Sequence, residues 1–517
     1  MIRKTLIATA VASAFMTSAA FAQFTGPSSS QTPYVTPTAA GWSVTSILTV
    51  GDTAGNGYKM VGIPDGLGAY DNGNDTFTVL MNHELGAGSG ITRAHGASGA
   101  FVSEWVINKN TLQVVSGGDL ITKSNIWYAD GNKYVQDTAN TFNRLCSADL
   151  PATSAFYNPT SGLGTQARIF MNGEESGNSG RAFATVATGA NKGNAYELPR
   201  LGNMSFENTL ANPYSGNKTV VIGLDDSTPG QVYVYTGNKT NAGSEIDRAG
   251  LNNGSLAGIK VNVAAAQGGA NNNQEVAQIN GAFSTVAIDT NVSGDAQQAN
   301  AAAAGVTEFA RPEDGHWADG KTFYFVTTGA TTVGSQTSRL YKLSFNEVAG
   351  VVDYGNGTVS MVKDSATLLG TDGATARSFD NMTVGDNGKI YVQEDPGNSQ
   401  YNAKTWEYNP ATGTWTQIFM SDVARFGSSD GTVPATAPYN KDEENSGIIE
   451  VTSILGRNDG KRYFLGDMQA HYNISGELVQ GGQLYMAAVP EPETYAMMLA
   501  GLGLLGFAAR RRKTSAA

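Results

Sequence analysis

Short runs of aromatic and β-branched residues recur along the chain, each bounded by Gly, Asn or Asp. The clearest of them are residues 76–81, 168–171, 219–224, 231–235, 322–326 and 389–392. Runs of this length and composition predict β-strands separated by turns. Helical character is confined to an Ala/Gln/Asn-rich stretch around residues 262–304, which can equally be a long surface insertion. The pattern therefore predicts an all-β protein.

Many short strands in one long chain indicate either a sandwich or a β-propeller. The size favours the propeller, because its blades need about 40–50 residues each. No strict repeat and no convincing linker interrupt the chain, so we expect one large domain with long loop insertions over residues 41–489. Residues 23–40 are rich in Ser, Thr, Pro and Gln and are expected to form a flexible leader.

The N-terminus has the three parts of a secretory signal. Arg3 and Lys4 form a short basic region, an apolar stretch follows, and Ala20-Phe21-Ala22 precedes Gln23. A basic head, a short apolar core and a small-x-small site predict cleavage and export, not a membrane span. We therefore expect residues 1–22 to be a signal peptide.

The C-terminal segment 490–513 begins with Pro490-Glu491-Pro492 and ends in the basic cluster 510–513. The apolar run between them, residues 494–509, is shorter than the roughly 20 residues that span a bilayer. The basic cluster should stay cytoplasmic. The segment resembles the PEP-CTERM sorting signal of Gram-negative bacteria that make exopolysaccharide. This resemblance implies export to the periplasm, outer surface or extracellular matrix, with a transient or retained membrane helix; an ordinary tail anchor is the alternative.

Charge and cysteine content narrow the function further. The net charge of −12 argues against nucleic acid as a partner. The single cysteine, Cys146, excludes an internal disulfide framework. Stability must therefore come from core burial, with bound metal as a supplement.

Carboxylates follow several predicted strands, inside Gly- and Asn-rich loops. They lie in the motifs Asn82-His83-Glu84, Asn172-Gly173-Glu174-Glu175, Glu207-Asn208, Asp225-Asp226, Arg311-Pro312-Glu313-Asp314, Asp380-Asn381 and Glu394-Asp395. Loops of a propeller converge on its channel, and Ca²⁺ takes six to eight oxygen ligands. Turn chemistry is the alternative for an isolated pair such as Asp225-Asp226, since Asp bonds its own backbone in turns. Glu174-Glu175 is harder to explain in that way, because adjacent carboxylates repel unless a cation lies between them.

Six stretches together resemble the PhoX-like alkaline phosphatases. They are residues 63–70, 80–84, 171–175, 311–314, 379–382 and 467–471, in the order of that family. The resemblance implies a β-propeller that holds Ca²⁺ and Fe³⁺ in its channel and hydrolyses phosphomonoesters. Carried over to this chain, it implies a catalytic role for Arg311 as a phosphate clamp. His83, in the motif that ends a predicted strand, is a second catalytic candidate, as a ligand, a general acid or a plain hydrogen-bond partner. The metal ligands that it implies are Glu84, Glu174, Glu175, Glu207, Glu313, Glu394 and Asp395.

One position departs from the family pattern. The family's phosphatases carry a Cys, as an iron ligand, immediately before the paired Glu, where this chain has Gly173. Cys146 lies upstream and need not replace it. Because a thiolate biases a site toward transition metals, its loss weakens the case for iron and favours a Ca²⁺-only site or an inactive relative.

These observations predict an exported, metal-dependent phosphomonoesterase. No Gly-x-Ser-x-Gly elbow, HExxH helix or Walker A sequence points to another hydrolase class. The alternative is a non-catalytic surface protein, stabilised by Ca²⁺, that binds exopolysaccharide or another partner. A third reading is a Ca²⁺-dependent hydrolase of other esters or lactones. Phosphate-binding cations in the channel would discriminate among these readings, and the candidates are Arg311, Lys123 and Arg377.

Overall fold

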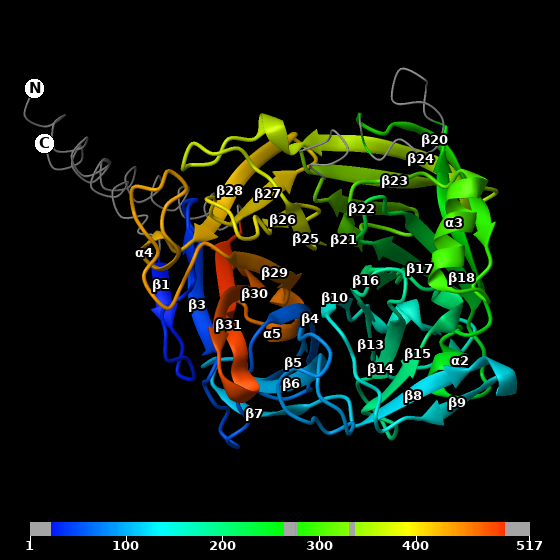
Figure 1. The fold of residues 1–517 in the computed structure, drawn as a ribbon, viewed down its shortest axis with the longest axis horizontal. Coiled ribbons are helices and arrows are strands. Elements are labelled where there is room, and N and C mark those ends of the chain that lie inside the picture. Colours follow the sequence, from blue (N-terminus) through cyan, green and yellow to red (C-terminus); the bar gives the residue numbers. More distant parts are fainter. Residues whose placement is uncertain (1–21, 263–274, 276, 330–336, 492–517) are drawn as a thin grey trace, which may run out of the picture.

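The computed structural model describes residues 22–262, 275, 277–329 and 337–491. Within them the chain forms a ring of antiparallel four-stranded blades around a central channel (Figure 1). The six innermost strands follow one another around the channel, each in contact with the next, and the last contacts the first. In order they are β4 (Pro64–Asp71), β10 (Leu145–Asp149), β16 (Phe206–Ala211), β21 (Pro312–Trp317), β25 (Phe379–Val384) and β29 (Glu443–Glu450). The all-β fold, a β-propeller, is confirmed.

Each blade continues outward from its innermost strand. Blade 1 adds β5 (Thr76–His83), β6 (Phe101–Asn108) and β7 (Val114–Asp119). Blade 2 adds β13 (Ile169–Glu174), β14 (Ala182–Val186) and β15 (Asn194–Glu197), and at its rim β8 (Lys123–Tyr128) and β9 (Lys133–Gln136). Blade 3 adds β17 (Lys218–Asp225), β18 (Val232–Asn238), β19 (Ser255–Val261) and the extra strand β20 (Gly281–Ile288).

The other three blades follow the same plan. Blade 4 adds β22 (Thr322–Thr327), β23 (Arg339–Val348) and β24 (Val351–Asp364), and β20 pairs with β24 so that blades 3 and 4 share one sheet. Blade 5 adds β26 (Ile390–Glu394), β27 (Lys404–Asn409), β28 (Thr414–Ser421) and β2 (Val35–Pro37). Blade 6 adds β30 (Lys461–Ile474), β31 (Val479–Pro490), β3 (Ser43–Thr49) and β1 (Ala22–Thr25).

The remaining elements are short. A small hairpin joins β11 (Tyr157–Asn158) to β12 (Leu163–Gly164). The α-helices are α2 (Glu245–Arg248), α3 (Gly294–Ala304), α4 (Val423–Phe426) and α5 (Thr452–Leu455). The 3₁₀ turns are η1 (Ala129–Gly131), η2 (Thr153–Ala155), η3 (Pro199–Leu201), η5 (Ser365–Thr367) and η6 (Gly476–Leu478).

The hydrophobic core lies in the seams between neighbouring blades. Phe142 and Phe183 pack in the seam of blades 1 and 2, and Tyr391 contacts Phe464 across the seam of blades 5 and 6. Because both faces of most blades are buried, their strands read as short apolar runs. The six runs predicted from the sequence are confirmed as strands: they coincide with β5, β13, β17, β18, β22 and β26.

The expected flexible leader at residues 23–40 is wrong. Strand β1 pairs with β3, and β2 pairs with β28, with Val35 opposite Ser421. Tyr34 and Val35 are fully buried. Strand β3 in turn pairs with β31, so the N-terminal segment closes the ring onto the C-terminal blade. The polar composition of the segment gave no sign of these pairings, and β2 and β3 have their partners β28 and β31 far away along the chain.

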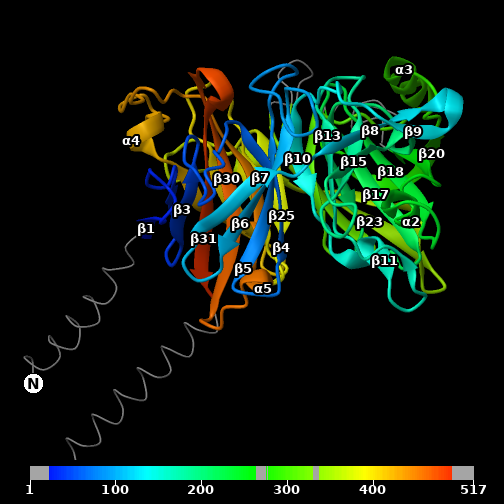
Figure 2. The same ribbon diagram turned by 90° about the horizontal axis from the view of Figure 1, so that it is seen from below.

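Two other expectations from the sequence concern segments that lie partly outside the described residues. In the stretch 262–304, β20 and α3 are formed, whereas residues 263–274 and 276 lie outside the description. The expected signal peptide lies outside it except for Ala22, and so does the sorting tail beyond Glu491. Among the described residues, no helix has the length and apolar character to cross a membrane. Figure 2 shows the ring edge-on, with β1 and β3 beside β31.

Candidate metal centre

The second residue of every innermost strand contributes one side chain to a ring around the channel. We call these six residues the inner ring: Asp65, Cys146, Glu207, Glu313, Asp380 and Glu444. In all six strands the pairing register shifts within two or three residues of this position. Such a bulge re-aims side chains and recurs next to functional sites. The six blades therefore repeat the same backbone geometry at this position, although the residue type differs among them.

A second set of side chains lies beside the inner ring, at the end of the second strand of each blade. There one residue donates its backbone N–H to the carbonyl of the residue that precedes the innermost strand, as Glu84 does to Ile63 at 2.9 Å. The same bond recurs in all six blades. We call its donors the outer ring: Glu84, Glu175, Asp226, Thr328, Asp395 and His471.

Three groups of ligand atoms show that the rings converge. Within each group the ligand atoms lie within 4.8 Å of one another. The groups are Asp65 with Glu84 and Cys146, Glu207 with Glu313 and Asp380, and Asp380 with Asp395 and Glu444. Asp380 belongs to two of them, so side chains from blades 3 to 6 form one continuous cluster.

In three of the predicted motifs, two adjacent candidate residues point in different directions, because neighbouring residues of a strand point to opposite faces. Glu84, Glu175 and Asp395 belong to the outer ring, whereas the residues just before them, His83, Glu174 and Glu394, point away from it. Of the predicted ligands, Glu84, Glu175, Glu207, Glu313 and Asp395 thus lie at the channel, and Glu174 and Glu394 do not.

The off-channel residues have structural partners. Glu174 accepts two 2.8 Å hydrogen bonds from Arg181. Glu394 accepts a 2.8 Å bond from the Trp406 indole and lies 3.9 Å from the buried Lys404. Each carboxylate therefore serves the packing of its own blade.

His83 also lies off the channel. Its ring stacks on Phe101 with 4.2 Å between centroids, and its Nε2 lies 2.8 Å from the Ser103 hydroxyl. Burial lowers its pKa to about 3, so the imidazole is neutral at ordinary pH. The expected role of His83 in catalysis is therefore not supported by its position.

Burial and mutual repulsion dominate the electrostatics of the rings. Desolvation, followed by neighbouring carboxylates, raises the pKa of Asp65, Glu207, Glu313 and Asp380 well above the ordinary range. Below the rings, both carboxylate oxygens of the fully buried Asp467 have no hydrogen-bond partner among the described residues. Buried carboxylates at such spacing need cations to ionise together, and an oxygen-rich donor set suits Ca²⁺.

Two arginines supply positive charge at the ring edge. Arg311 donates from Nε and Nη2 to the two oxygens of Asp226, each at 2.7 Å, and lies 3.4 Å from Glu313. Arg144 occupies the equivalent position before β10 and pairs with Glu84 at 2.7 Å and with Glu175. Their side chains remain 38% and 49% exposed, so both guanidinium groups can be reached from solvent. The other two cationic candidates lie elsewhere: Lys123 begins the rim strand β8, and Arg377 stacks on Tyr401.

A thiol does reach the channel, from Cys146 and not from position 173; the expectation about iron stays a prediction. A Cβ at Gly173 would lie 2.3 Å from the Cβ of Phe206, so this position is packed against β16 and has no room for a side chain. Cys146 instead faces Asp65 and Glu84. Burial and these carboxylates raise its pKa well above the usual range. The site thus offers one thiol among carboxylates, a donor set that also suits a transition metal.

The ring members that the predicted ligand set lacks are Asp65, Cys146, Asp226, Thr328, Asp380, Glu444 and His471. Of these, Asp226 and Asp380 belong to acidic motifs that the sequence did indicate. His471 Nε2 lies 3.6 Å from Glu444, which links it to the cluster. A weak signal was present: five inner-ring carboxylates are each followed by Gly, Asn or Asp. These dipeptides are Asp65-Gly66, Glu207-Asn208, Glu313-Asp314, Asp380-Asn381 and Glu444-Asn445.

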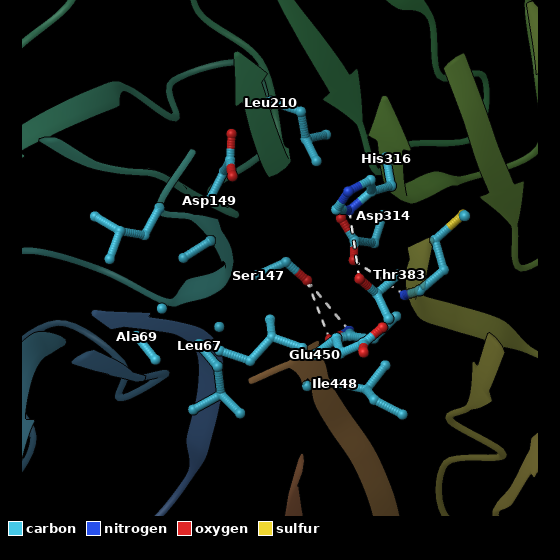
Figure 3. Close-up of a pocket in the computed structure, with 18 of the residues that line it drawn as sticks. Leu67, Ala69, Ser147, Asp149, Leu210, Asp314, His316, Thr383, Ile448 and Glu450 are labelled. Atoms are coloured by element: carbon cyan, nitrogen blue, oxygen red, sulfur yellow. Dashed lines mark hydrogen bonds between the residues drawn. The ribbon is translucent and has the colours of Figure 1, made fainter. Parts of the chain in front are cut away.

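Below the rings the same strands line a cavity of about 380 Å³. Asp149, Asp314 and His316 lie on one side of it, and Leu67 and Ile448 lie on another (Figure 3). Burial lowers the pKa of His316 to about 4, and it raises those of Asp149 and Asp314 to about 7. The cavity is thus a mixed apolar and weakly acidic chamber.

Comparison with known proteins gives a family and a fold. A family model described as alkaline phosphatase PhoX matches residues 186–466, and one for the PEP-CTERM protein-sorting motif matches residues 488–513. The structure is similar to Pseudomonas fluorescens PhoX in complex with vanadate, a transition state analogue. The TM-score is 0.63 at 12% identity, covering 90% of this chain and 97% of that one. A Leishmania mexicana mannose phosphorylase in complex with phosphate ion gives a TM-score of only 0.24, at 10% identity over 66% of this chain and 83% of that one. No curated protein sequence matches.

Proposed function

The chain belongs to the alkaline phosphatase PhoX family, whose model covers residues 186–466, and on this premise we propose that it is an exported, metal-dependent phosphomonoesterase. The observation that supports this most is the convergence of six blades on one cluster of buried carboxylates with two arginines at its edge. Such a cluster can hold cations, and the arginines can hold an anion beside them.

The three groups of ligand atoms differ in the type of metal that they would hold. The carboxylate-only groups, Glu207 with Glu313 and Asp380 and Asp380 with Asp395 and Glu444, would hold Ca²⁺. The group containing Cys146 would hold iron, because a thiolate favours a transition metal. When bound, the cations supply Lewis-acid chemistry that neutralises phosphate oxygens and activates the attacking oxygen.

The chain's own residues then position the substrate. Asp226 fixes the Arg311 guanidinium through Nε and Nη2, which leaves Nη1 for a phosphate oxygen. Arg144, held by Glu84, would contact the same phosphate from the neighbouring side. Two arginines fixed by carboxylates offer a preorganised clamp, which stabilises charge developing in the transition state.

The PEP-CTERM motif implies export and sorting to the cell surface. Together with the N-terminal signal pattern, it supports action on phosphomonoesters outside the cytoplasm, with the C-terminal helix processed during sorting. Association with exopolysaccharide stays a prediction.

Phosphatase activity of the purified mature protein tests the proposal. The chelator-stripped protein is assayed with p-nitrophenyl phosphate after addition of Ca²⁺, iron or both, with elemental analysis of each sample. Glu207→Gln, in the inner ring, should abolish turnover, whereas Glu174→Gln, bonded to Arg181 off the channel, should retain it. Bound calcium without turnover under any metal would refute the phosphatase and favour the non-catalytic surface protein.

A further inference from the structure

A layer of polar side chains lies directly below the inner ring. The residue after each ring member also turns toward the channel axis at four positions: Ser147, Asn208, Asp314 and Asn381, all buried and all lining the lower cavity. We call these four residues the floor. They bond to one another across blades: Asn208 Nδ2 donates to Asp314 Oδ1 at 2.7 Å, and Asn381 Nδ2 donates to Ser147 Oγ at 3.2 Å. The floor thus joins strands that face each other across the channel.

One floor residue contacts the inner ring itself. Ser147 Oγ donates to Glu207 Oε1 at 2.6 Å, and the Ser147 backbone N–H approaches the same oxygen at 3.4 Å. Ser147 is 2% exposed, so no solvent replaces these bonds. Its partner Asn381 follows Asp380, which belongs to the same ligand group as Glu207. Figure 3 shows Ser147 with the dashed lines that mark its hydrogen bonds to Asn381.

The contact has a geometric consequence for Glu207. A glutamate has three rotatable side-chain bonds, so repulsion from Glu313 and Asp380 can turn the Glu207 carboxylate away from them. Fixing one oxygen from below leaves the carboxylate a single orientation, in which a ligand oxygen stays within 4.8 Å of those of Glu313 and Asp380. Supporting hydrogen bonds of this kind orient metal ligands and strongly affect metal affinity.

We infer that Ser147 and Asn381 are positioning residues of the metal centre: they hold the Glu207 carboxylate toward Glu313 and Asp380. The inference deepens the proposed function and rests on it for any effect on turnover. Its effect on cation binding can be measured whether or not the protein is a phosphatase.

The chain contains a matched control for Ser147. Ser421 is also buried, and its Oγ donates at the same distance, 2.6 Å, to Glu443 Oε1. Glu443 precedes the ring residue Glu444 and lies against Asn402 and Ser421 instead of the rings. Ser147→Ala and Ser421→Ala therefore remove equivalent bonds, and only the first concerns a ring ligand.

The experiment measures the thermal stability of the full mature protein, stripped with EDTA and titrated with Ca²⁺. The bond from Ser147 is stronger to the ionised carboxylate that would bind Ca²⁺ than to a protonated one, and a difference of about 1.4 kcal/mol is a factor of ten in affinity. Ser147→Ala should therefore raise the Ca²⁺ concentration needed for a given rise in Tm about tenfold. Ser421→Ala should leave that concentration unchanged, although both variants lose stability without Ca²⁺. Ser147→Thr, which keeps the hydroxyl, should remain close to the unmodified protein.

Equal Ca²⁺ titration curves for Ser147→Ala and Ser421→Ala would overturn the inference. If Ser147→Ala does not fold, Asn381→Ala provides the second test, with an expected shift of about threefold, because a neutral hydrogen bond contributes less. Stabilisation by Ca²⁺ without phosphatase activity in the unmodified protein would count against the proposed function only. A shifted titration would still support the positioning role.

Discussion

Glu207→Gln should stabilise the metal-free protein and destabilise the Ca²⁺-loaded one. Without cations, the carboxylate of Glu207 repels those of Glu313 and Asp380, whose ligand atoms lie within 4.8 Å. At an effective dielectric constant of about 20, two charges at that distance repel by about 3 kcal/mol. Glutamine keeps the shape and can still accept the bond from Ser147, but it removes the charge.

The expected shifts follow from this energy. Near 60 °C the entropy of unfolding is about 2.1 cal/mol/K per residue, so a domain of this size changes its Tm by about 1 °C per kcal/mol. Glu207→Gln should therefore raise the Tm by about 3 °C in EDTA at pH 8. With Ca²⁺ at a hundred times its Kd, the unmodified protein gains about 2.7 kcal/mol per site. A variant that has lost a charged ligand should lose most of that gain.

The assay is thermal unfolding followed by circular dichroism, in EDTA and in Ca²⁺, with Glu174→Gln as the control. Glu174 is bonded to Arg181 off the channel, so its variant should have a lower Tm in both conditions.

The pH dependence of the metal-free stability adds an independent check. The raised pKa of Glu207 means that its contribution to metal-free stability is present below about pH 4.5 and is lost as the pH rises. Glu207→Gln should flatten that loss. A variant that is less stable than the unmodified protein without Ca²⁺ at pH 8 would refute repulsion within the ring.

Three further predictions test other parts of the structure. Cys146→Ser should keep stabilisation by Ca²⁺ but lose iron in elemental analysis, and retained iron would exclude the thiol as its ligand. Arg144→Met should raise the KM for a phosphomonoester about tenfold or more. Arg181→Met, which breaks only the pair with Glu174, should not, and equal effects would remove Arg144 from the clamp. Asp149→Asn should gain about 2 kcal/mol relative to the unmodified protein between pH 5 and 8 in urea unfolding. The reason is that burial raises the Asp149 pKa to about 7, so its folded form loses stability as the pH rises; a constant difference would contradict this.

The sequence pattern predicted six of the strands and the all-β class, and chain length together with the family resemblance favoured a propeller over a sandwich. None of these indicated how the ring closes. Strands such as β5 and β22 are continuous apolar runs because both of their faces are buried. The N-terminal strands have no such run, and β2 and β3 pair with strands at the far end of the chain, with Val35 opposite Ser421 and Ser43 opposite Ala488. Pairing at that separation depends on the finished ring, so local composition indicated a leader where the structure has the two strands β1 and β2.

Sequence reasoning located the acidic turns and could not choose the correct residue within each. In Glu174-Glu175 and Glu394-Asp395 both members are acidic, and the choice depends on which one follows the last paired residue of its strand. A shift of one position along a strand would turn the side chain that faces the channel into the blade and its neighbour into the channel. That register is fixed by the pairing with the innermost strand, as in the bond from the Glu175 N–H to the Arg144 carbonyl, which a single sequence does not reveal.

Cys146 shows that residues adjacent in sequence need not lie together in the channel. Gly173 directly precedes the glutamate pair, yet it lies on the second strand of blade 2, against Phe206. Cys146 lies on the first strand, paired beside it, and reaches Asp65 and Glu84 of blade 1. The absence of a thiol at position 173 therefore carries no information about iron. In the proposed metal centre, the Cys146 thiol would have to lose its proton to bind a metal, although burial raises its pKa. A cation able to displace that proton would be a transition metal rather than Ca²⁺, so the position of Cys146 supports the proposal of a mixed centre over one that holds calcium alone.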